Sequence, residues 1–121
     1  MTAPPDVLRL SGLRVRGRHG VLALEREQGQ EFVIDVALSL DTGAAARSDD
    51  LAETVDYGAL AVALADVVGG PAVQLIETLA ERLAQVCLQD RRVSRVEVTV
   101  HKPSAPIPLD FTDVSVTVVR P

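Results

Sequence analysis

The chain is poor in lysine, aromatic residues and cysteine, and each scarcity excludes a class of protein. Among its 121 residues lysine occurs once, at Lys102, and arginine supplies the other basic side chains. Tyr57 and two phenylalanines are the only aromatic residues. With a formal net charge of −5, the chain is not expected to bind nucleic acid through phosphate contacts or base stacking.

The single cysteine, Cys87, cannot form an internal disulfide, and it falls in an apolar helical pattern that predicts a core position in a reducing compartment. No apolar run reaches the roughly 18 residues of a membrane-spanning helix, and no signal-peptide pattern opens the chain. We therefore expect a cytoplasmic protein with no membrane partner. Residues 1–5 are predicted to be a disordered lead, and residues 6–121 a single domain.

The first third of the chain predicts two strands joined by a long hairpin. Apolar and polar residues alternate roughly from Val7 to Arg16, with an interruption that a bulge at Gly12 would explain. The second strand is clearer, because residues 31–41 place a large apolar side chain at every second position. The connection between them, which contains Gly29, is expected to be a loop.

The middle third changes to a helical period. Asp56 stands where an N-cap would precede a helix over residues 57–68. That helix is apolar nearly all round, so both of its sides are expected to be covered. A Gly-Gly-Pro break follows, and a second helix is predicted from about Val73 to Leu88, with Cys87 in its apolar stripe.

The last third returns to strands, with alternating valines over residues 93–101 and 113–120. Between them, three prolines in residues 103–108 predict a stiff extended segment. The order strand-strand-helix-helix-strand-strand predicts an α+β fold, a four-stranded antiparallel sheet with two helices on one face. Two open sheet edges and an apolar first helix favour an oligomer, in particular a ring.

Four side chains are candidates for chemistry, and each has a plainer interpretation. Unlike arginine, a partly buried lysine can release its proton and act as a base, but Lys102 is also compatible with a solvated loop edge. Tyr57 would serve equally as a core or staple residue, and Glu77 is favoured in a first helical turn by the helix dipole alone. The simplest interpretation of Glu25 is a solvated, charged side chain in a loop. The spacing of these residues alone selects none of them.

The histidines and the general motifs add little. The sequence contains no phosphate-binding loop, dinucleotide fingerprint, metal-ligand pair or nucleophile elbow. His19 and His101 lie far apart in the sequence, so no metal site is expected. His101 precedes Lys102 on a strand and is expected to point to the opposite face, which leaves it outside the catalytic set.

Taken together, several short blocks resemble the dihydroneopterin aldolase family of the folate pathway. The resemblance covers nearly the whole chain, from about Val7 to Arg120, and its blocks keep the same order. Each block is weak alone, but the ordered set is specific. The blocks are residues 17–21 (GRHGV), 25–32 (EREQGQEF), 48–51 (SDDL), 54–57 (TVDY), 75–77 (LIE), 101–103 (HKP) and 105–108 (APIP).

The resemblance implies a fold, an assembly and a reaction. The family has a tunnelling fold of two hairpins and two helices, and its members form tetrameric rings that stack into octamers with sites between subunits. The implied reaction splits 7,8-dihydroneopterin into 6-hydroxymethyl-7,8-dihydropterin and glycolaldehyde. It uses no cofactor, neither metal nor Schiff base, because the pterin ring accepts the electrons. Epimerisation of the side chain to dihydromonapterin is also expected.

The resemblance also implies roles for particular residues. Lys102 matches the catalytic lysine, a general base toward the side-chain hydroxyl. Tyr57 matches a tyrosine that handles a proton at the carbon leaving the bond, and the adjacent subunit would supply it. Glu25 matches a glutamate near the lysine and the substrate side chain.

The remaining matched positions concern the pterin ring. Glu77 matches the pterin anchor, a role that suits a carboxylate because the ring presents two parallel N–H donors. By similarity, the backbone at Ile76 and Val55 would complete the contacts along the ring edge.

Two alternatives stay open. One is the related dihydroneopterin triphosphate epimerase, which would need a basic pocket; Arg14, Arg16 and Arg18 are the candidates to line it. The other is a non-catalytic pterin-binding ring, which the joint presence of Lys102, Tyr57 and Glu77 disfavours.

Overall fold

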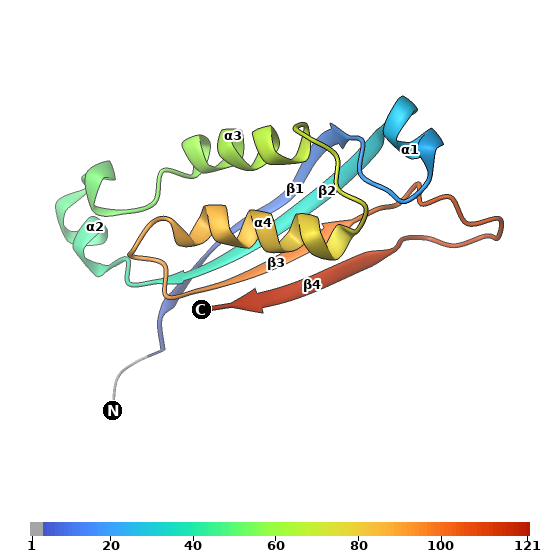
Figure 1. Ribbon diagram of the computed structural model, residues 1–121. Coiled ribbons are helices and arrows are strands. Elements are labelled where there is room, and N and C mark those ends of the chain that lie inside the picture. Colours follow the sequence, from blue (N-terminus) through green and yellow to red (C-terminus); the bar gives the residue numbers. More distant parts are fainter. Residues whose placement is uncertain (1–3) are drawn as a thin grey trace.

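The computed structural model describes residues 4–121 and contains one antiparallel sheet with helices against it (Figure 1). The sheet has the order β1-β2-β3-β4, with strands β1 (Asp6–Gly17), β2 (Gln30–Leu40), β3 (Arg95–His101) and β4 (Ser115–Arg120). The helical segments are α1 (Ala23–Gln28), α2 (Gly43–Ser48), the 3-10 helix η1 (Leu51–Glu53), α3 (Tyr57–Val68) and α4 (Ile76–Leu88). The predicted α+β fold is confirmed.

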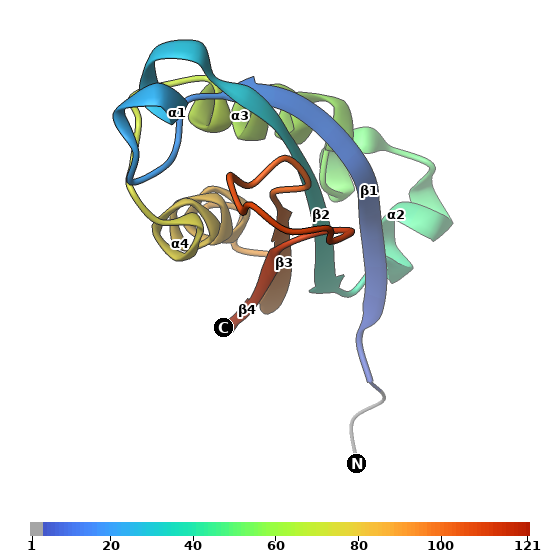
Figure 2. The ribbon, with the colours of Figure 1, turned by 90° about the vertical axis from the view of Figure 1, so that its right-hand side faces the viewer.

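The core lies between the sheet and the two long helices, α3 and α4. Alternate residues of β2 and β3 point toward these helices and are buried, because a strand turns successive side chains to opposite faces. They pack with buried side chains of the helices, and the set includes Phe32, Ile34, Val36, Leu38, Val96, Val98, Val100, Leu64, Val68, Leu79 and Leu83. We call the opposite face, which bears Asp35, Glu97 and Thr99, the outer face. The sheet is curved, as the view from its end shows (Figure 2).

The predicted bulge in β1 is confirmed. The β1–β2 register shifts between Leu10 and Leu13, and Gly12 has a φ of 73°, a left-handed conformation that glycine adopts readily. The Gly12 N–H released from the ladder donates to Asp35 Oδ1 on β2 at 2.7 Å. The bulge is therefore tied to a side chain on the outer face.

The cap and the length of α3 are as predicted, and a single chain covers one of its two sides. The Asp56 side chain accepts a hydrogen bond from the Ala59 N–H at 3.0 Å, and the helix spans Tyr57–Val68. Leu64 and Val68 are buried, whereas Val62 on the other side is 62% exposed. One chain thus covers a single side of this apolar helix, since it has only one sheet to offer.

The second long helix begins three residues later than the predicted start at Val73. The Val73 N–H donates to His19 Nδ1 at 3.1 Å, and its carbonyl accepts from the Gly20 N–H at 3.0 Å. Contacts with a distant loop therefore take the place of a first helical turn. Glu77 still lies in the first turn of α4, as predicted.

The two C-terminal strands are shorter than their alternating patterns. Val93 belongs to a turn, in which its N–H donates to the Asp90 carbonyl at 3.1 Å, and β3 starts at Arg95. Asp113 precedes β4 and uses its carboxylate on His101 instead of joining the ladder. The alternation of apolar and polar residues extends beyond the residues that are paired in the sheet, so the pattern overestimates the length of both strands.

Three further expectations concern composition. Cys87 is buried, as predicted, and burial raises the pKa of its thiol to about 11. The predicted disordered lead falls mainly on residues 1–3, outside the described residues, while Pro4 and Pro5 are exposed. Between residues 4 and 121, no helix has the length and apolar character needed to cross a membrane.

Candidate active site

Lys102 and Glu25 form a nearly buried ion pair. Lys102 Nζ lies 2.5 Å from Glu25 Oε2, and the two side chains are only 12% and 7% exposed. The interpretations of Lys102 as a solvated loop edge and of Glu25 as a solvated loop charge are therefore wrong. Glu25 also lies in a short helix, α1, and not in the predicted loop. The lone lysine is the cation at this site.

Two further groups hold the Glu25 carboxylate. The Leu22 N–H donates to Oε1 at 3.3 Å, and Gln30 Nε2 donates to Oε2 at 3.0 Å. Burial raises the pKa of Glu25, but the hydrogen bond from Lys102 and those from Leu22 and Gln30 outweigh it, so the pKa lies below its ordinary value. Glu25 is thus an anion in the folded protein at neutral pH.

Gln30 is a site neighbour that the sequence did not single out. It opens β2, and its amide oxygen, Oε1, is buried with no hydrogen-bond partner in the part of the chain that the structure describes. The only sequence signal was its place directly after Gly29, whose positive φ turns the chain from α1 into the strand.

His19 fastens the loop that precedes α1 to the helices. Its Nε2–H donates to the Val68 carbonyl at 2.6 Å, while Nδ1 accepts from the Val73 N–H, so both nitrogens are used by a neutral ring. Burial lowers the pKa of His19, and the hydrogen bond to Val68 opposes this only in part. His19 therefore has a structural role: it holds the loop that leads to Glu25 against the helices.

Glu77 and Ile76 open α4 at the same end of the molecule as Lys102 (Figure 1). The linker before this helix reaches the Glu25 region, because Val73 is bonded to Gly20, which lies directly against the Glu25 carboxylate. The Glu77 side chain is exposed, and the first N–H groups of the helix have no partner within it. This end therefore offers a base candidate and a carboxylate for recognition.

Tyr57 and Val55 lie at the other end of the molecule. They precede or open α3, and η1 beside them is tied to the start of β3 through the bond from Arg92 to the Ala52 carbonyl. Val55 is buried, whereas Tyr57 is 62% exposed, so the interpretation of Tyr57 as a core residue is wrong. A single chain does not bring Tyr57 to Lys102.

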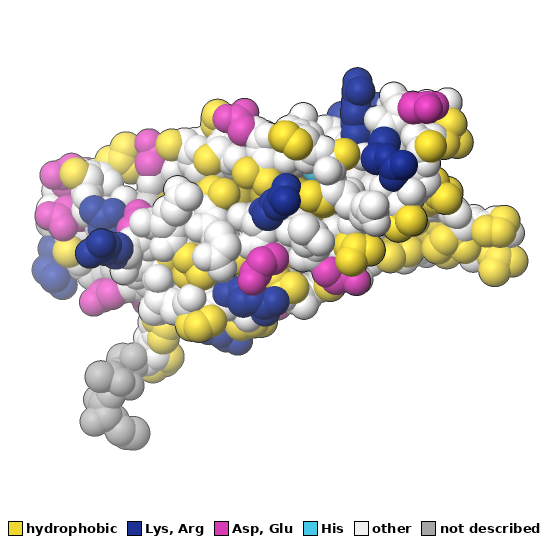
Figure 3. All heavy atoms as spheres, in the orientation of Figure 1, with side chains coloured by type: hydrophobic (Ala, Val, Ile, Leu, Met, Phe, Trp, Pro, Cys, Tyr) yellow, Lys and Arg dark blue, Asp and Glu magenta, His cyan; other side chains and the backbone are white. Residues whose placement is uncertain are grey.

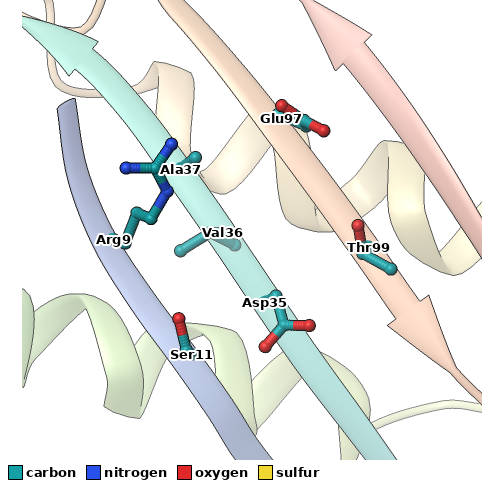
Figure 4. A pocket seen from close by; sticks show the side chains of 7 residues that line it. All are labelled: Arg9, Ser11, Asp35, Val36, Ala37, Glu97 and Thr99. Atoms are coloured by element: carbon teal, nitrogen blue, oxygen red, sulfur yellow. The ribbon is translucent and has the colours of Figure 1, made fainter.

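The outer face carries a separate hollow of about 410 Å³, shown in Figure 4. It is lined by polar side chains of three strands, among them Arg9, Asp35, Glu97 and Thr99, and it contains none of the predicted site residues. Within residues 4–121 no three His, Cys, Asp or Glu side chains are grouped so that they could hold a metal ion.

Replacing Gly20 by Ala should damage the ion pair without touching either partner. A Cβ at Gly20 would overlap the Glu25 carboxyl group, so Glu25 must move. Because small displacements of catalytic groups are costly, we expect turnover to fall at least about tenfold while the fold is kept. Initial rates and a thermal unfolding curve of the Gly20→Ala protein measure the two effects.

A double variant tests whether the substitution at Gly20 acts through Glu25. If Gly20→Ala acts through Glu25, adding it to Glu25→Ala should change the rate by less than about twofold, because one contact cannot be lost twice. Additive losses would show that Gly20 acts elsewhere.

The fold and the site together define the class of this protein. It is an α+β protein with a buried lysine–glutamate ion pair at one end of its sheet. Residues 8–119 match the family model described as FolB, dihydroneopterin aldolase. A dihydroneopterin aldolase of Streptomyces coelicolor is 56% identical over 115 residues, which is 95% of this chain and 97% of that protein. Another, from Bacillus subtilis, is 37% identical over 116 residues, with 95% and 97% covered.

Solved structures of dihydroneopterin aldolases also resemble this chain. The structure of E. coli dihydroneopterin aldolase in complex with neopterin matches with a TM-score of 0.87 and 28% identity, covering 96% of this chain and 99% of that one. A Burkholderia thailendensis dihydroneopterin aldolase bound to guanine matches with a TM-score of 0.78 and 30% identity, covering 96% and 90%. The chain belongs to the dihydroneopterin aldolase family and has its tunnelling fold. It is a lyase of folate biosynthesis, as the sequence resemblance implied.

Proposed function

We propose that this protein splits 7,8-dihydroneopterin into 6-hydroxymethyl-7,8-dihydropterin and glycolaldehyde, with Lys102 as the general base. The observation that carries the proposal is the contact of 2.5 Å between Lys102 Nζ and Glu25 Oε2. A lysine held in this way has a defined position and can accept a proton where arginine cannot. We place the reaction in the cytoplasm, where the single buried cysteine stays reduced.

In the proposed mechanism, Lys102 first gives up to solvent the proton that it carries in the ion pair, and its neutral amine then accepts the proton of a side-chain hydroxyl of the substrate. The adjacent carbon–carbon bond then breaks, its electron pair passes into the dihydropterin ring, and glycolaldehyde leaves. The new charge on Lys102 forms next to the Glu25 carboxylate, which stabilises it. Tyr57 supplies the proton at the carbon that remains on the ring. If, before glycolaldehyde leaves, the ring-bound carbon adds back to the opposite face of its carbonyl and the carbonyl oxygen regains a proton from Lys102, the product is dihydromonapterin; we propose this epimerisation as a second activity.

Glu77 is proposed to anchor the pterin ring, together with the backbone at Ile76 and Val55. Neopterin and guanine, which the two related structures bind, share an amino group beside a ring N–H, and a carboxylate accepts from both donors. The exposed carboxylate in the first turn of α4 suits this role.

We further propose a homo-oligomeric ring, paired into an octamer, with each site between two chains. Among the described residues, the outer edges of β1 and β4 have no strand partner, and α3 is covered on one side only. Apolar side chains are also exposed at the projecting tip between β3 and β4, where Leu109 is 75% exposed (Figure 3). A second chain would cover these surfaces and bring its Tyr57 to Lys102.

Of the three arginines considered for the triphosphate epimerase, Arg16 and Arg18 line a small pocket of about 250 Å³, and Arg14 does not. Arg16 also donates to the Gln28 carbonyl at 3.0 Å. The relatives described above carry the aldolase name, so we retain the aldolase.

The direct experiment is to incubate the purified oligomer with 7,8-dihydroneopterin and to measure glycolaldehyde. We expect product at catalytic enzyme concentrations without added metal. An intact oligomer that forms no glycolaldehyde at micromolar concentration would refute the proposed reaction, and binding of neopterin without turnover would identify a non-catalytic pterin-binding ring.

Glu77→Ala should weaken pterin binding more than it slows the chemical step. Hydrogen bonds to a charged partner contribute about 1.5–3 kcal/mol each, so we expect the affinity for neopterin to fall at least about tenfold in a fluorescence titration. Glu81→Ala is the matched control, because Glu81 lies one turn further along α4 and, among residues 4–121, pairs only with Arg120 at the surface. Equal affinities of the two variants would contradict the anchor role.

A further inference from the structure

His101 and Lys102 are consecutive residues whose side chains go to opposite sides of the sheet. Lys102 reaches Glu25 at the end of the molecule that carries α1. His101 lies on the outer face, as its neighbours in the β3 ladder require, and contacts two carboxylates there. The proposed mechanism uses Lys102 and leaves His101 without a task.

Both ring nitrogens of His101 are engaged. Nδ1 lies 2.6 Å from Asp113 Oδ2 and Nε2 lies 2.7 Å from Asp35 Oδ2. Two carboxylates accept at once only from an imidazolium, which has an N–H at each position. The hydrogen bond to Asp113 and that to Asp35 raise the pKa of His101 against an opposing effect of burial.

These contacts connect parts of the chain that are distant in sequence. Asp35 belongs to β2, and its second oxygen accepts from Gly12 N–H at the bulge of β1. Asp113 lies near the end of the long connection between β3 and β4, two residues before β4 begins. We call His101, Asp35 and Asp113 the outer-face clamp; it joins β1, β2, β3 and the base of that connection.

The clamp lies directly beside the backbone of Lys102. The Lys102 N–H donates to the Val114 carbonyl at 2.7 Å, one residue from Asp113. The connection that follows Lys102 is largely exposed and projects from the sheet (Figures 1 and 2). Lys102 lies beyond the last residue of β3, and its carbonyl accepts from the Ala105 N–H at 3.2 Å within the connection. The bond to Val114 and the clamp fasten it to the base of that connection.

We propose that His101 is a positioning residue, which through Asp35 and Asp113 orients the Lys102 backbone so that Nζ meets Glu25 and the substrate hydroxyl. This inference rests on the proposed role of Lys102. The clamp touches neither the substrate anchor at Glu77 nor the ion pair itself, so its loss should affect the chemical step and leave pterin binding intact.

The test compares His101→Ala with Thr99→Ala in the purified oligomer. Thr99 lies on the same strand and face, and it also bonds to the neighbouring strand, through Thr117 Oγ1 at 2.8 Å, but it is remote from Lys102. Since a displacement of about 1 Å can cost about a hundredfold in rate, we expect His101→Ala to lower kcat about 10- to 100-fold. Thr99→Ala should change it less than about twofold, and neopterin affinity should stay within about threefold in both.

Asp113 provides a conservative pair. Asp113→Asn keeps an oxygen that accepts the Nδ1–H, whereas Asp113→Ala removes the acceptor. We expect the Asn variant to retain most of the wild-type kcat and the Ala variant to resemble His101→Ala. Equal losses in both would overturn a role that depends on the hydrogen bond.

A last comparison separates an effect on the position of Lys102 from a general destabilisation of the fold. In a Lys102→Arg background the residual rate no longer depends on the base, so adding His101→Ala should have almost no further effect. An unchanged kcat in His101→Ala, or a parallel loss of neopterin affinity, would overturn the inference. If Lys102→Arg itself retained full turnover, the role of Lys102 in the proposed function would fail first, and the positioning role with it.

Discussion

Replacing Lys102 by Arg is expected to lower the rate of glycolaldehyde formation by about 10²- to 10⁴-fold, the usual contribution of general acid–base catalysis. Arginine keeps the positive charge that Glu25 needs as a partner, so the buried carboxylate is not left unpaired. Its guanidinium stays protonated and cannot take the hydroxyl proton. Neopterin affinity should therefore remain within about threefold of the wild type.

Arg120 offers a matched control for this exchange of cations. Arg120 Nε lies 3.0 Å from Glu81 Oε2 in an exposed ion pair, and surface pairs contribute little. Arg120→Lys should leave turnover and affinity unchanged. A Lys102→Arg protein with a near-normal rate would refute the general-base role, whatever the state of its ion pair.

Mixing two inactive chains should restore activity. Tyr57 and Lys102 lie at opposite ends of one chain, so a site between subunits would take Lys102 from one chain and Tyr57 from its neighbour. Oligomers assembled from Lys102→Arg and Tyr57→Phe chains would contain intact pairs at about a quarter of their sites. Co-expression with two different tags and purification on both gives such mixed oligomers, and glycolaldehyde release measures their activity.

The two parent variants and a mixture of their separately assembled oligomers serve as controls. All three should stay at the low rate of the parents, because no intact pair forms in them. A mixed oligomer no more active than its parents would refute a site shared in this way, and the Tyr57 assignment with it. The same preparation run on a sizing column measures the oligomeric state that the open edges of β1 and β4 favour.

Much of the fold could be predicted because its signals are local. The period of two in β2, the Asp56 cap of α3 and the glycine at the β1 bulge each depend on a few neighbouring residues. The errors arose where a distant partner intervened. Val73 looks helical by period, but His19 and Gly20 hold its backbone outside α4.

The candidate site was predicted to a different degree for different residues. The lone lysine and the family resemblance selected Lys102, Tyr57, Glu77 and Glu25, and their roles stay predictions. Gln30 and the clamp partner Asp113 carried no usable signal, because a glutamine and an aspartate in polar segments are ordinary. Their importance arises from what they contact in three dimensions.

By itself, the amino-acid sequence determined the order of the four strands and the two long helices, the aliphatic core and the family. Periodicity, caps and short ordered motifs act over a few residues and can be read along the chain. Only the tertiary structure decided that the one lysine is buried against Glu25, that Tyr57 is too far from it in a single chain, and that His101 is held by two carboxylates. The physical reason is that burial and ion pairing depend on the packing of segments distant in sequence, and no local pattern records that packing.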